Sequence, residues 1–462
     1  MDGLECSEIS KNDLERTLRI DSEFYQKENL NVEKLLQKTE YFPLTKFTSV
    51  SDGNHMAISD RFITVGIPYY RGQDVKSFFI EDSQPICIDE ESFGSSYMMR
   101  SHLQKGDVLL SIVGTIGKLS LVNSNRKATC SCKLAILRPQ KGVSGEVIAT
   151  FLTSKYGQNQ IKKYTRGAVQ MGLILEDMDQ LLVPNFSNEF ITKITELFTD
   201  MNQAKTNSIL VYDEANRLLL DLLSIETQFE DNGIISTSKL LSESFKVSGR
   251  LDAEYYQPKY EQIENQIASN NTVYNSCKIY DKNFNPNDDI IYQYIELANV
   301  DLMGGIATPS SIIGKELPSR ARRLVKTGQI IISSIEGSLQ SCALITEQFN
   351  NAICSTGFFV LDSEKYNPET LLVLFKSEPI QELLKKRCSG TILTAISKDE
   401  LEKMPLPELD KGIQEQIAEK VQESFRLRKK SKKLLAIAVK AVEMAIETDE
   451  ETAITWLREQ GV

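Results

Sequence analysis

Very few residues of this chain have types and spacing that suit catalysis. It contains only two histidines, His55 and His102, and it lacks both the H-E-x-x-H zinc motif and a nucleophile-elbow serine. Gly114-Thr-Ile-Gly117-Lys118 resembles a phosphate-binding loop, but the G-x-x-x-x-G-K-[ST] spacing fails and Leu119 stands where a hydroxyl should bind magnesium. We therefore expect a non-catalytic binding protein, in which His55 is a hydrogen-bonding residue of its loop.

Cysteine spacing and the start of the chain indicate where such a protein would work. The eight cysteines are scattered, with one C-x-C and no C-x-x-C, which fits reduced thiols better than a disulfide framework or a metal site. Met1 to Asp21 is acidic and polar where a signal peptide would be basic and then apolar, and no uncharged stretch reaches about 18 residues. We expect a cytoplasmic protein without membrane spans or bound metal.

The distribution of charge is more informative than its sum. A formal net charge of −11 argues against nucleic acid, because DNA affinity comes largely from neutralising phosphates. From Ser95 to Gln170, however, the chain has twelve basic residues and two acidic ones, Asp107 and Glu146. This basic island is either a DNA-binding surface or a solvated face whose counter-charges come from elsewhere in the fold.

Side chains that could read base edges lie just before the island. Gly66 to Val75 contains two tyrosines together with Arg71 and Gln73, whereas the matching stretch, Ile291 to Val300, has Gln293 and Asn299 but no arginine. Alternatively, both stretches are amphipathic strands whose tyrosines pack in the core.

We predict that Lys118 and Lys133 contact phosphates, and that Arg71 and Gln73 set sequence preference. The candidate DNA-binding residues are Tyr70, Arg71, Gln73, Lys118, Lys133, Arg138, Lys163, Arg166, Gln293, Arg320, Arg322, Arg323 and Lys386.

The elements that must position these residues occur twice. Arg19-Ile-Asp-Ser-Glu-Phe-Tyr-Gln26 returns as Arg250-Leu-Asp-Ala-Glu-Tyr-Tyr-Gln257, with five identities in eight positions. Lys105-Gly-Asp-Val-Leu-Leu-Ser111 returns as Thr327-Gly-Gln-Ile-Ile-Ile-Ser333, a turn glycine followed by a buried strand. Gly167 and Pro184 likewise match Gly390 and Pro407, so the sequence predicts one fold used twice.

A long amphipathic helix of about 33 residues follows each copy, which gives about 50 Å at 1.5 Å per residue. The two apolar seams have 4-3 spacing and share one register at an offset of 223 residues, and the second is weakened by Lys420 and two serines. The small seam residues favour pairing of the helices with each other, although each could instead pack on its own domain. The predicted seams are 190, 194, 197, 201, 204, 208, 211, 215, 218 and 222, and the same numbers increased by 223.

These features predict an α+β fold with a pseudo-two-fold internal repeat, in which two β-rich domains with helices are separated by two long antiparallel coiled-coil helices. The acidic tail is predicted to form a short helix around Trp456. The expected boundaries are 1–185 for the first domain, 186–225 for the central helix, 226–245 for a linker, 246–408 for the second domain, 409–447 for the distal helix and 448–462 for the tail.

Taken together, these motifs resemble the specificity (S) subunit of type I restriction-modification systems. The resemblance covers nearly the whole chain and is carried by the opening motif at Arg250 to Tyr256, the Gly66 to Val75 stretch, Lys105 to Lys118, and Pro-Leu-Pro407 followed by Gln414-Glu-Gln-Ile417. It implies that each domain is a target recognition domain for one half of a split DNA target, and that the helices fix the gap between the halves.

The resemblance also implies partners. Two modification (methyltransferase) subunits would dock on the helices, restriction subunits would join them, and S-adenosylmethionine, ATP and Mg would be bound by those partners and not by this chain. The second copy departs from the pattern, with Glu336-Gly-Ser338 where the first copy has Gly114 to Lys118. Two alternatives stay open: a methylation-only or other phage-defence system, and an interaction scaffold that binds protein partners instead of DNA.

Overall fold

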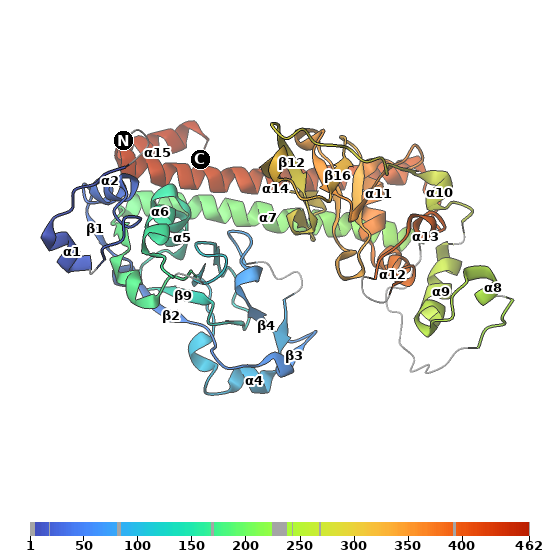
Figure 1. The fold of residues 1–462 in the computed structure, drawn as a ribbon, viewed down its shortest axis with the longest axis horizontal. Helices are drawn as coiled ribbons and strands as arrows, with labels where there is room; N and C mark the ends of the chain where they lie inside the picture. Colours follow the sequence, from blue (N-terminus) through green and yellow to red (C-terminus); the bar gives the residue numbers. More distant parts are fainter. Residues whose placement is uncertain are drawn as a thin grey trace. The chain divides into compact units, whose positions relative to one another are not determined.

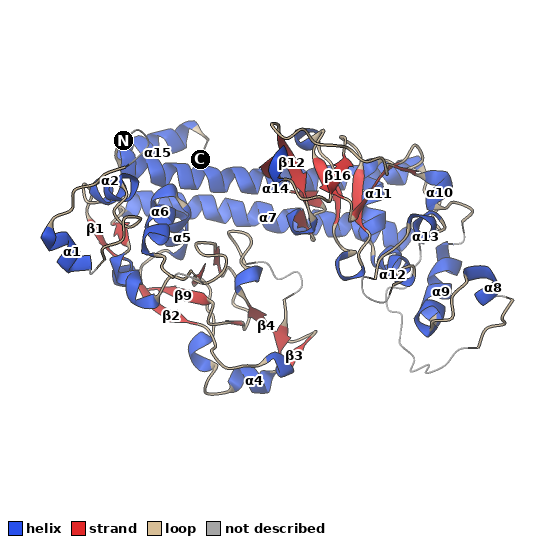
Figure 2. Ribbon diagram, viewed as in Figure 1, coloured by secondary structure: helices blue, strands red, loops and turns tan. Residues whose placement is uncertain are grey.

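The chain folds into two compact units, each of which combines helices with small β-sheets (Figure 2). The first unit comprises residues Met1–Gln203 and Lys430–Val462, and the second comprises Ala204–Lys429. No helix in the described part of the chain is long and apolar enough to cross a membrane. The computed structural model describes residues 5–17, 19–80, 85–167, 171–223, 238–242, 244–267, 269–390 and 394–461, so most of the predicted linker lies outside the described residues.

Among the described residues of the first unit there are three sheets, with strand orders β1-β10, β2-β9-β6-β7 and β3-β5-β4-β8. Figure 1 labels β1, β2, β3, β4 and β9 among these strands. Apolar and polar residues do not alternate clearly along the central strands β6 and β9, because both faces of these strands are covered and nearly every side chain is buried. The strands are β1 (Tyr41–Pro43), β2 (Thr48–Asp52), β3 (Phe62–Ile63), β4 (Ile67–Tyr70), β5 (Cys87–Ile88), β6 (Val108–Ser111), β7 (Leu119–Leu121), β8 (Thr129–Cys130), β9 (Leu134–Pro139) and β10 (Leu182–Pro184).

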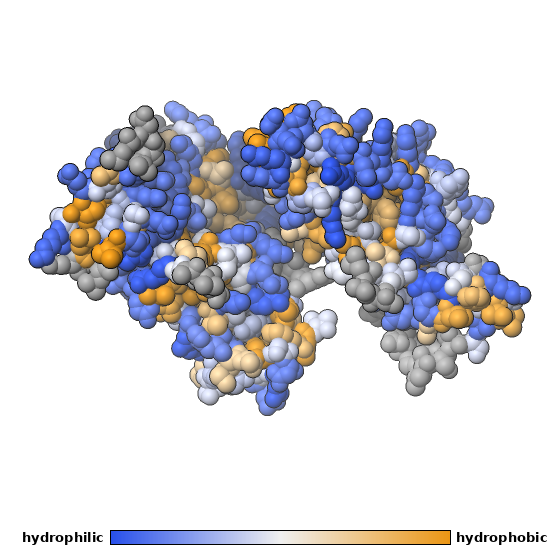
Figure 3. All heavy atoms as spheres, viewed as in Figure 1, coloured by the Kyte–Doolittle hydropathy of each residue, from blue (hydrophilic) through white to orange (hydrophobic). Residues whose placement is uncertain are grey.

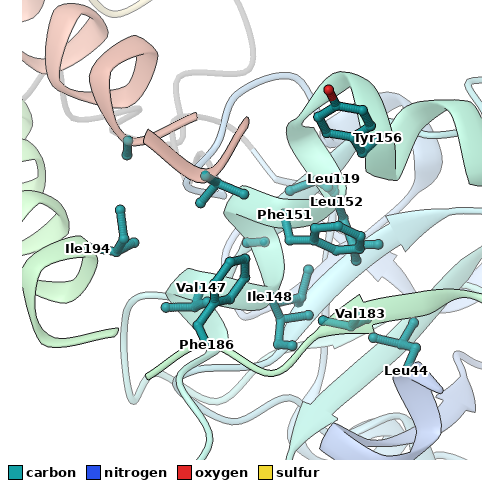
Figure 4. Close-up of a cluster of buried hydrophobic side chains, with 14 of the residues drawn as sticks. Leu44, Leu119, Val147, Ile148, Phe151, Leu152, Tyr156, Val183, Phe186 and Ile194 are labelled. Carbon is teal, nitrogen blue, oxygen red and sulfur yellow. The ribbon is translucent and has the colours of Figure 1, made fainter. Parts of the chain in front are cut away.

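Helix α5 covers the second of these sheets, and α6 packs against α5 and α2. Helices α5 and α6 each begin at a capping serine: the Ser144 hydroxyl accepts a hydrogen bond from the backbone N–H of Val147, and Ser154 accepts one from Gly157. Side chains of α5 such as Phe151 pack against the unit's main apolar cluster (Figure 4). The helices are α1 (Lys11–Thr17), α2 (Lys27–Leu36), α3 (Leu44–Phe47), α4 (Glu90–Gly94), α5 (Gly145–Thr153), α6 (Lys155–Tyr164) and α15 (Glu450–Glu459), with 3-10 turns η1 (Ser59–Arg61), η2 (Gly72–Asp74), η3 (Met99–Ser101) and η4 (Leu175–Gln180).

The described part of the second unit has two sheets, with strand orders β11-β20-β17-β18-β14-β13 and β15-β12-β19-β16. Its strands are β11 (Lys278–Ile279), β12 (Ile291–Ile295), β13 (Val300–Asp301), β14 (Ile306–Ala307), β15 (Ser310–Ile313), β16 (Ala321–Leu324), β17 (Ile330–Ser333), β18 (Cys342–Leu344), β19 (Ile353–Ser355) and β20 (Phe358–Asp362). Its helices are α8 (Phe245–Ser248), α9 (Pro258–Ile267), α10 (Val273–Ser276), α11 (Pro368–Lys376), α12 (Glu378–Lys386) and α13 (Lys398–Glu402), with 3-10 turns η5 (Ala253–Tyr256), η6 (Leu297–Asn299), η7 (Gly314–Glu316), η8 (Glu336–Ser338) and η9 (Glu347–Phe349).

The internal repeat is present in the hydrogen bonds as well as in the sequence. Val108 pairs with Leu137 between β6 and β9, as Ile330 pairs with Leu361 between β17 and β20. At each helical corner one glutamine closes the same two bonds: Gln158 Nε2 donates to the carbonyls of Gly117 and Leu152, and Gln381 Nε2 donates to those of Leu339 and Phe375. The prediction of one fold used twice is therefore confirmed.

The opening motif forms the same network in both units. The Arg19 guanidinium donates two hydrogen bonds to Asp21, and the Tyr25 hydroxyl donates to the Arg19 carbonyl at 3.2 Å. Arg250 and Asp252 form the same fork, and the Tyr256 hydroxyl donates to the Arg250 carbonyl at 2.9 Å. The guanidinium holds the pKa of each aspartate below its usual value, mainly through the side-chain hydrogen bond. This explains why the sequence keeps these residues in one order.

The two long helices, α7 (Asn188–Leu223) and α14 (Lys411–Glu447), pack against each other as antiparallel partners. In the second unit the Ser424 hydroxyl donates to the Ser208 carbonyl at 2.7 Å, and Lys420 pairs with Glu214. In the first unit the Ser431 hydroxyl donates to the Met201 carbonyl at 3.1 Å. The predicted pairing of the helices is confirmed, and the small seam residues account for the direct side-chain to backbone bonds. The predicted tail helix around Trp456 is α15.

The predicted 4-3 seam holds in the first unit but not throughout the second. After Ser208 the buried positions of α7 are Tyr212, Ala215 and Leu219. The predicted 211 and 222 are therefore wrong, whereas the predicted Leu218 is partly buried against the core of the second unit. In α14 Val421 is buried in place of the predicted Lys420. The buried positions 204, 208 and 212 are separated by four residues twice in succession, where the 4-3 pattern expects a spacing of three after 208. Such an irregularity is a stutter, which locally unwinds a coiled coil.

Candidate nucleic-acid interface

Four loops of the first unit meet at one end of the sheet that contains β6 and β9. Ser111 pairs with Leu134 at this end, so the loop that follows β6 and the loop that precedes β9 leave the sheet together. The Ile112 N–H donates to the Lys133 carbonyl at 3.0 Å. We call residues 71–74, 112–118, 131–133, 166–167 and 171–172 the first loop surface.

Short polar contacts hold these loops to one another. The Thr115 hydroxyl donates to the Gly72 carbonyl at 3.2 Å and lies 2.9 Å from the Ser111 hydroxyl. Gly172 forms backbone bridges with both Val113 and Arg166. Because each loop is bonded to a neighbour, side chains on different loops are presented in a fixed arrangement, as base recognition requires.

Three of the predicted contact residues lie exposed on this surface. Lys118 and Lys133 are exposed, and neither has an ion-pair partner among the residues that the structure describes. Gln73 is exposed on η2, one residue from Gly72. Cationic side chains free of internal partners can neutralise phosphates, and a free amide can hydrogen-bond to a base edge.

Two other predicted residues reach the surface with an internal acidic partner. Arg71 bonds Asp74 through Nε at 3.1 Å and Nη2 at 3.3 Å, and its side chain is 31% exposed. Arg166 contacts both carboxylate oxygens of Asp177 and is 44% exposed. Part of each guanidinium is therefore already occupied, and DNA would have to compete for the remaining N–H groups.

The second unit has an equivalent surface built on the same backbone bonds. The Ser334 N–H donates to the Gly357 carbonyl, as Ile112 does to Lys133, and Ala395 bridges Ile335 and Ser389, as Gly172 bridges Val113 and Arg166. Gly167 and Gly390 have φ values of 132° and 127°, a region that favours glycine. We call residues 334–340, 355–357, 389–390 and 394–395 the second loop surface.

The two loop surfaces have equivalent backbone hydrogen bonds but different side chains at the equivalent positions. Lys133 corresponds to Gly357 and Lys118 to Ser341, because the Ser111 N–H donates to the Lys118 carbonyl as Ser333 does to Ser341. A cation is nevertheless present in the turn before β16: the Thr356 N–H donates to the carbonyl of Arg320, an exposed residue without an ion pair in the described part of the chain. Each surface thus has its own set of polar groups.

Other predicted contacts are held inside the fold. Tyr70 is 2% exposed and packs in an apolar cluster with Leu109 and Ile136, so the alternative that the tyrosines pack in the core is confirmed for it. Tyr69 and Tyr294 are buried as well. We therefore remove Tyr70 from the proposed DNA contacts.

Lys163 and Lys386 occupy the same position of the repeat and belong to its framework. Lys163 pairs with Glu33 at 2.7 Å with a side chain 4% exposed, and Lys386 pairs with Glu264 at 2.8 Å with a side chain 11% exposed. Each ammonium also lies over an aromatic ring of the opening motif, Phe24 at 4.5 Å or Tyr255 at 5.0 Å. Burial lowers the pKa of Lys386, and the hydrogen bond to Glu264 opposes that effect. Neither lysine is available to a phosphate.

Arg138 also has an internal role. Its guanidinium bonds both oxygens of Asp107, at 2.9 and 2.7 Å, and this carboxylate is only 1% exposed. The hydrogen bond to Asp107 is the main reason that the pKa of Arg138 is raised. The equivalent pair in the second unit is Gln329 with Asp362, so this position carries no shared positive charge.

The remaining candidates of the second unit support neighbouring loops. Gln293 donates to the Ser311 hydroxyl across β12 and β15 at 2.8 Å. Arg322 donates to the Ser319 carbonyl at 3.1 Å, and Arg323 donates to the Asn283 side chain at 2.5 Å. None of the three has a hydrogen bond to the second loop surface within the described ranges.

The basic island divides into two equal groups. Six of its cations form ion pairs, and five of the six acidic partners lie outside the island, as the counter-charge alternative predicted. These pairs are Arg100–Asp52, Lys127–Glu90, Arg138–Asp107, Lys155–Glu447, Lys163–Glu33 and Arg166–Asp177. The other six, Lys105, Lys118, Arg126, Lys133, Lys141 and Lys162, have no ion pair among the residues described.

Sequence reasoning missed two residues of the loop surfaces. Thr115 connects two loops of the first surface, and Glu336 occupies on the second surface the place of Gly114, because Ile335 and Val113 make the equivalent bridges. The alignment of the two copies placed Glu336 opposite Gly114 but gave neither Glu336 nor Thr115 a role, because their contacts form only in the folded loops.

The two histidines form hydrogen bonds and a ring contact within the first unit. The His55 ring is hydrogen-bonded to Asp52 at 2.5 Å, as predicted for a hydrogen-bonding residue. His102 stacks on Phe93 and bonds its carbonyl at 2.8 Å. Over the described ranges no three His, Cys, Asp or Glu side chains are grouped so that they could hold a metal ion.

Comparisons with known proteins found similarity only at the level of solved structures. No family model and no curated protein matches the chain. The S subunit of a type I restriction-modification system from M. genitalium is 13% identical, aligns over 88% of this chain and 95% of its own length, and has a TM-score of 0.38. The HsdS subunit from Thermoanaerobacter tengcongensis is 14% identical over 89% of this chain and 97% of its own, with a TM-score of 0.31.

A third similar chain comes from a structural study of complex assembly and conformational transition in the type I R-M system. It is 13% identical over 89% of this chain and 98% of its own, with a TM-score of 0.31. Because these identities and scores are low, we base the functional proposal on the residues and contacts of this chain.

Proposed function

We propose that this chain is the DNA-specificity subunit of a type I restriction-modification enzyme, in which each loop surface reads one half of a bipartite target. The observation that carries this proposal is the pair of loop surfaces: they share one hydrogen-bonded backbone framework and differ in their exposed polar side chains. A protein that reads two different half-sites with one fold needs this combination.

The division of labour follows from the partners that each side chain has. Lys118, Lys133 and Arg320 have no internal ion pair in the described part of the chain, so they supply phosphate contacts. Gln73, together with the unoccupied N–H groups of Arg71, supplies base contacts on the first surface. The chain itself contributes sequence choice, not chemistry.

Modification subunits would bring S-adenosylmethionine and flip the target base, and restriction subunits would bring ATP and Mg. The proposal assigns no cofactor to this chain. It assigns two modification subunits to each chain because the chain presents two recognition units.

Salt dependence of DNA binding tests the proposal. We expect the double variant Lys118→Glu/Lys133→Glu to weaken binding of the assembled methyltransferase to all duplexes by a similar factor. The slope of log K against log salt should flatten by about 1.8, or about 0.9 for each lost phosphate contact. Gln73→Ala should instead change preference at one base pair, by about 1–3 kcal/mol.

Lys141→Glu is the matched control, because Lys141 is also exposed and unpaired among the described residues but lies outside the loop surface. It should leave the salt slope unchanged. The proposal fails if the wild-type assembly binds all duplexes equally at moderate salt, or if Lys141→Glu and the double variant have the same effect.

A further inference from the structure

The motif that opens each unit presents one large apolar side chain to solvent. Ile20 is 91% exposed and Leu251 is 77% exposed. One exposed aliphatic residue is ordinary on a protein surface. These two, however, occupy the same position of the repeat, between the arginine and the aspartate of the opening motif. We call Ile20 and Leu251 the apolar knobs.

The surrounding motif fixes each knob in its exposed position. In the first unit Arg19 Nε and Nη2 bond Asp21 at 2.6 and 2.9 Å, so the fork spans the residue between them. The Tyr25 hydroxyl fixes the Arg19 carbonyl in addition. With both neighbours and the backbone held, Ile20 is displayed without taking part in the core. Little backbone freedom at this position therefore remains to be lost on binding.

The second knob is held by the same bonds. Arg250 bonds Asp252 at 2.9 and 2.5 Å, and Arg250 Nη1 also donates to the Cys388 carbonyl at 3.0 Å. Leu240, Leu241 and Phe245 of the segment that precedes the motif are also exposed. Figure 3 shows the hydrophobic colour concentrated on the segment that carries α8.

Folding does not explain why both copies keep an apolar residue here, since a side chain this exposed contributes little to the core. The loop surfaces give the contrast: there Lys133 corresponds to Gly357, and Arg71 corresponds to Glu296. The two units therefore differ where the proposed DNA half-sites differ, and they agree at the knob. Agreement at an exposed position indicates one kind of ligand that both units bind.

A second exposed pair accompanies the knobs. Glu23 and Glu254 occupy equivalent positions three residues after Ile20 and Leu251, and both are exposed. Neither forms an ion pair with any residue that the structure describes. An aliphatic side chain with a nearby carboxylate is complementary to an apolar pocket that has a basic residue at its rim.

We propose that the apolar knobs are the docking points of a protein partner that binds this chain twice, once at each opening motif, through an apolar pocket with a basic rim. The inference rests on the proposed function, which identifies this partner as the modification subunit. It differs from docking on the long helices, because neither opening motif belongs to α7 or α14.

Counting bound partners tests the inference. The full chain is mixed with the purified modification subunit, and the stoichiometry is measured by native mass spectrometry. Wild type is expected to bind two subunits, Ile20→Asp and Leu251→Asp one each, and the double variant none. The conservative variants Ile20→Leu and Leu251→Ile should keep two. All variants should keep the wild-type melting temperature, because both side chains are exposed.

Leu210→Asp is the matched control for helix docking. Leu210 is 54% exposed on α7, and the residue at the offset of 223 is Lys433, so this apolar position is not repeated. It should still bind two subunits. Two bound subunits in the Ile20→Asp/Leu251→Asp variant, or loss of binding in Leu210→Asp alone, would overturn the inference. If the proposed function itself is wrong, the wild-type chain would bind no modification subunit, which distinguishes that failure from failure of this inference.

Discussion

The Arg138–Asp107 pair gives the sharpest test of which basic residues support the fold. We expect Arg138→Ala to destabilise the first unit by about 3 kcal/mol. Removing one partner of a buried pair typically costs about 3–5 kcal/mol, because the remaining charge stays buried. The lower end applies here: Arg138 is 34% exposed, so water can reach the site, and the Gln104 N–H continues to donate to Asp107 at 2.8 Å.

The second unit supplies a natural rescue for this substitution. Gln329 and Asp362 occupy the places of Asp107 and Arg138 and are joined at 3.3 Å. The Lys326 N–H donates to Gln329 there, as the Gln104 N–H donates to Asp107. The double variant Asp107→Gln/Arg138→Asp should therefore regain most of the stability, to within about 1 kcal/mol of wild type, because an amide–carboxylate bond replaces the ion pair. Arg138→Asp alone should be the least stable, since it places two carboxylates together.

Fluorescence of Trp456 during urea unfolding provides the assay. Trp456 is the only tryptophan of the chain, and it packs against the main core of the first unit. Arg138 belongs to the same unit, so its loss should be visible in this signal. DNA binding by the folded Arg138→Ala protein should equal that of wild type. If the variant kept the wild-type midpoint and bound DNA more weakly, Arg138 would be a DNA contact and our assignment would be refuted.

Three further predictions use the same logic. Asp21→Asn should lower first-unit stability at neutral pH. Because the folded-state pKa of Asp21 is lowered from 3.8, this difference should begin to shrink as pH falls towards 3.8 and vanish below the lowered pKa, while Asp252→Asn should leave the Trp456 transition unchanged. Gly106→Ala should cost about 1–2 kcal/mol in that transition, since φ is 94° there and no atom crowds the position, so the cost is backbone strain alone. Val421→Ala should lower the melting temperature seen by circular dichroism through a loss of about 2 kcal/mol, whereas Lys420→Ala should cost under about 1 kcal/mol, because only Val421 is in the helix seam.

Features set by local pattern could be predicted from the sequence. The opening motif, the turn glycines and the two long helices all depend on residues close in the chain, and the internal repeat supplies a second example of each. The seam of α7 could not be read past Ser208, because Val211 and Tyr212 are both apolar and only the packing of the second unit decides between them. Local periodicity gives no preference in such a case.

Most ion pairs of the basic island could not be predicted, because they join residues distant in sequence. Lys163 bonds Glu33, which lies 130 residues away in the sequence. The residues around Lys163 and Lys133 within the basic island do not indicate that Lys163 is paired and buried while Lys133 is exposed. A usable signal was nevertheless present. Lys163 and Lys386 recur at the offset of 223 that relates the helices, and Glu33 and Glu264 recur at the offset of the opening motif. Two residues that recur together are candidates for a shared internal contact.

The two copies therefore serve as a two-sequence alignment within one chain. Whether a position is buried or exposed decides what a similar residue in both copies indicates. Agreement at buried positions, as for Lys163 and Lys386, reports a shared framework. Agreement at exposed positions, as for Ile20 and Leu251, reports a shared ligand. Disagreement on one common backbone, as for Lys133 and Gly357, reports different ligands. Arg320, in the turn before β16, is hydrogen-bonded through its carbonyl to Thr356 next to Gly357, so under the proposed function the second unit would keep a phosphate contact at a changed position. Two half-sites that differ in sequence but share a sugar-phosphate backbone would impose this pattern.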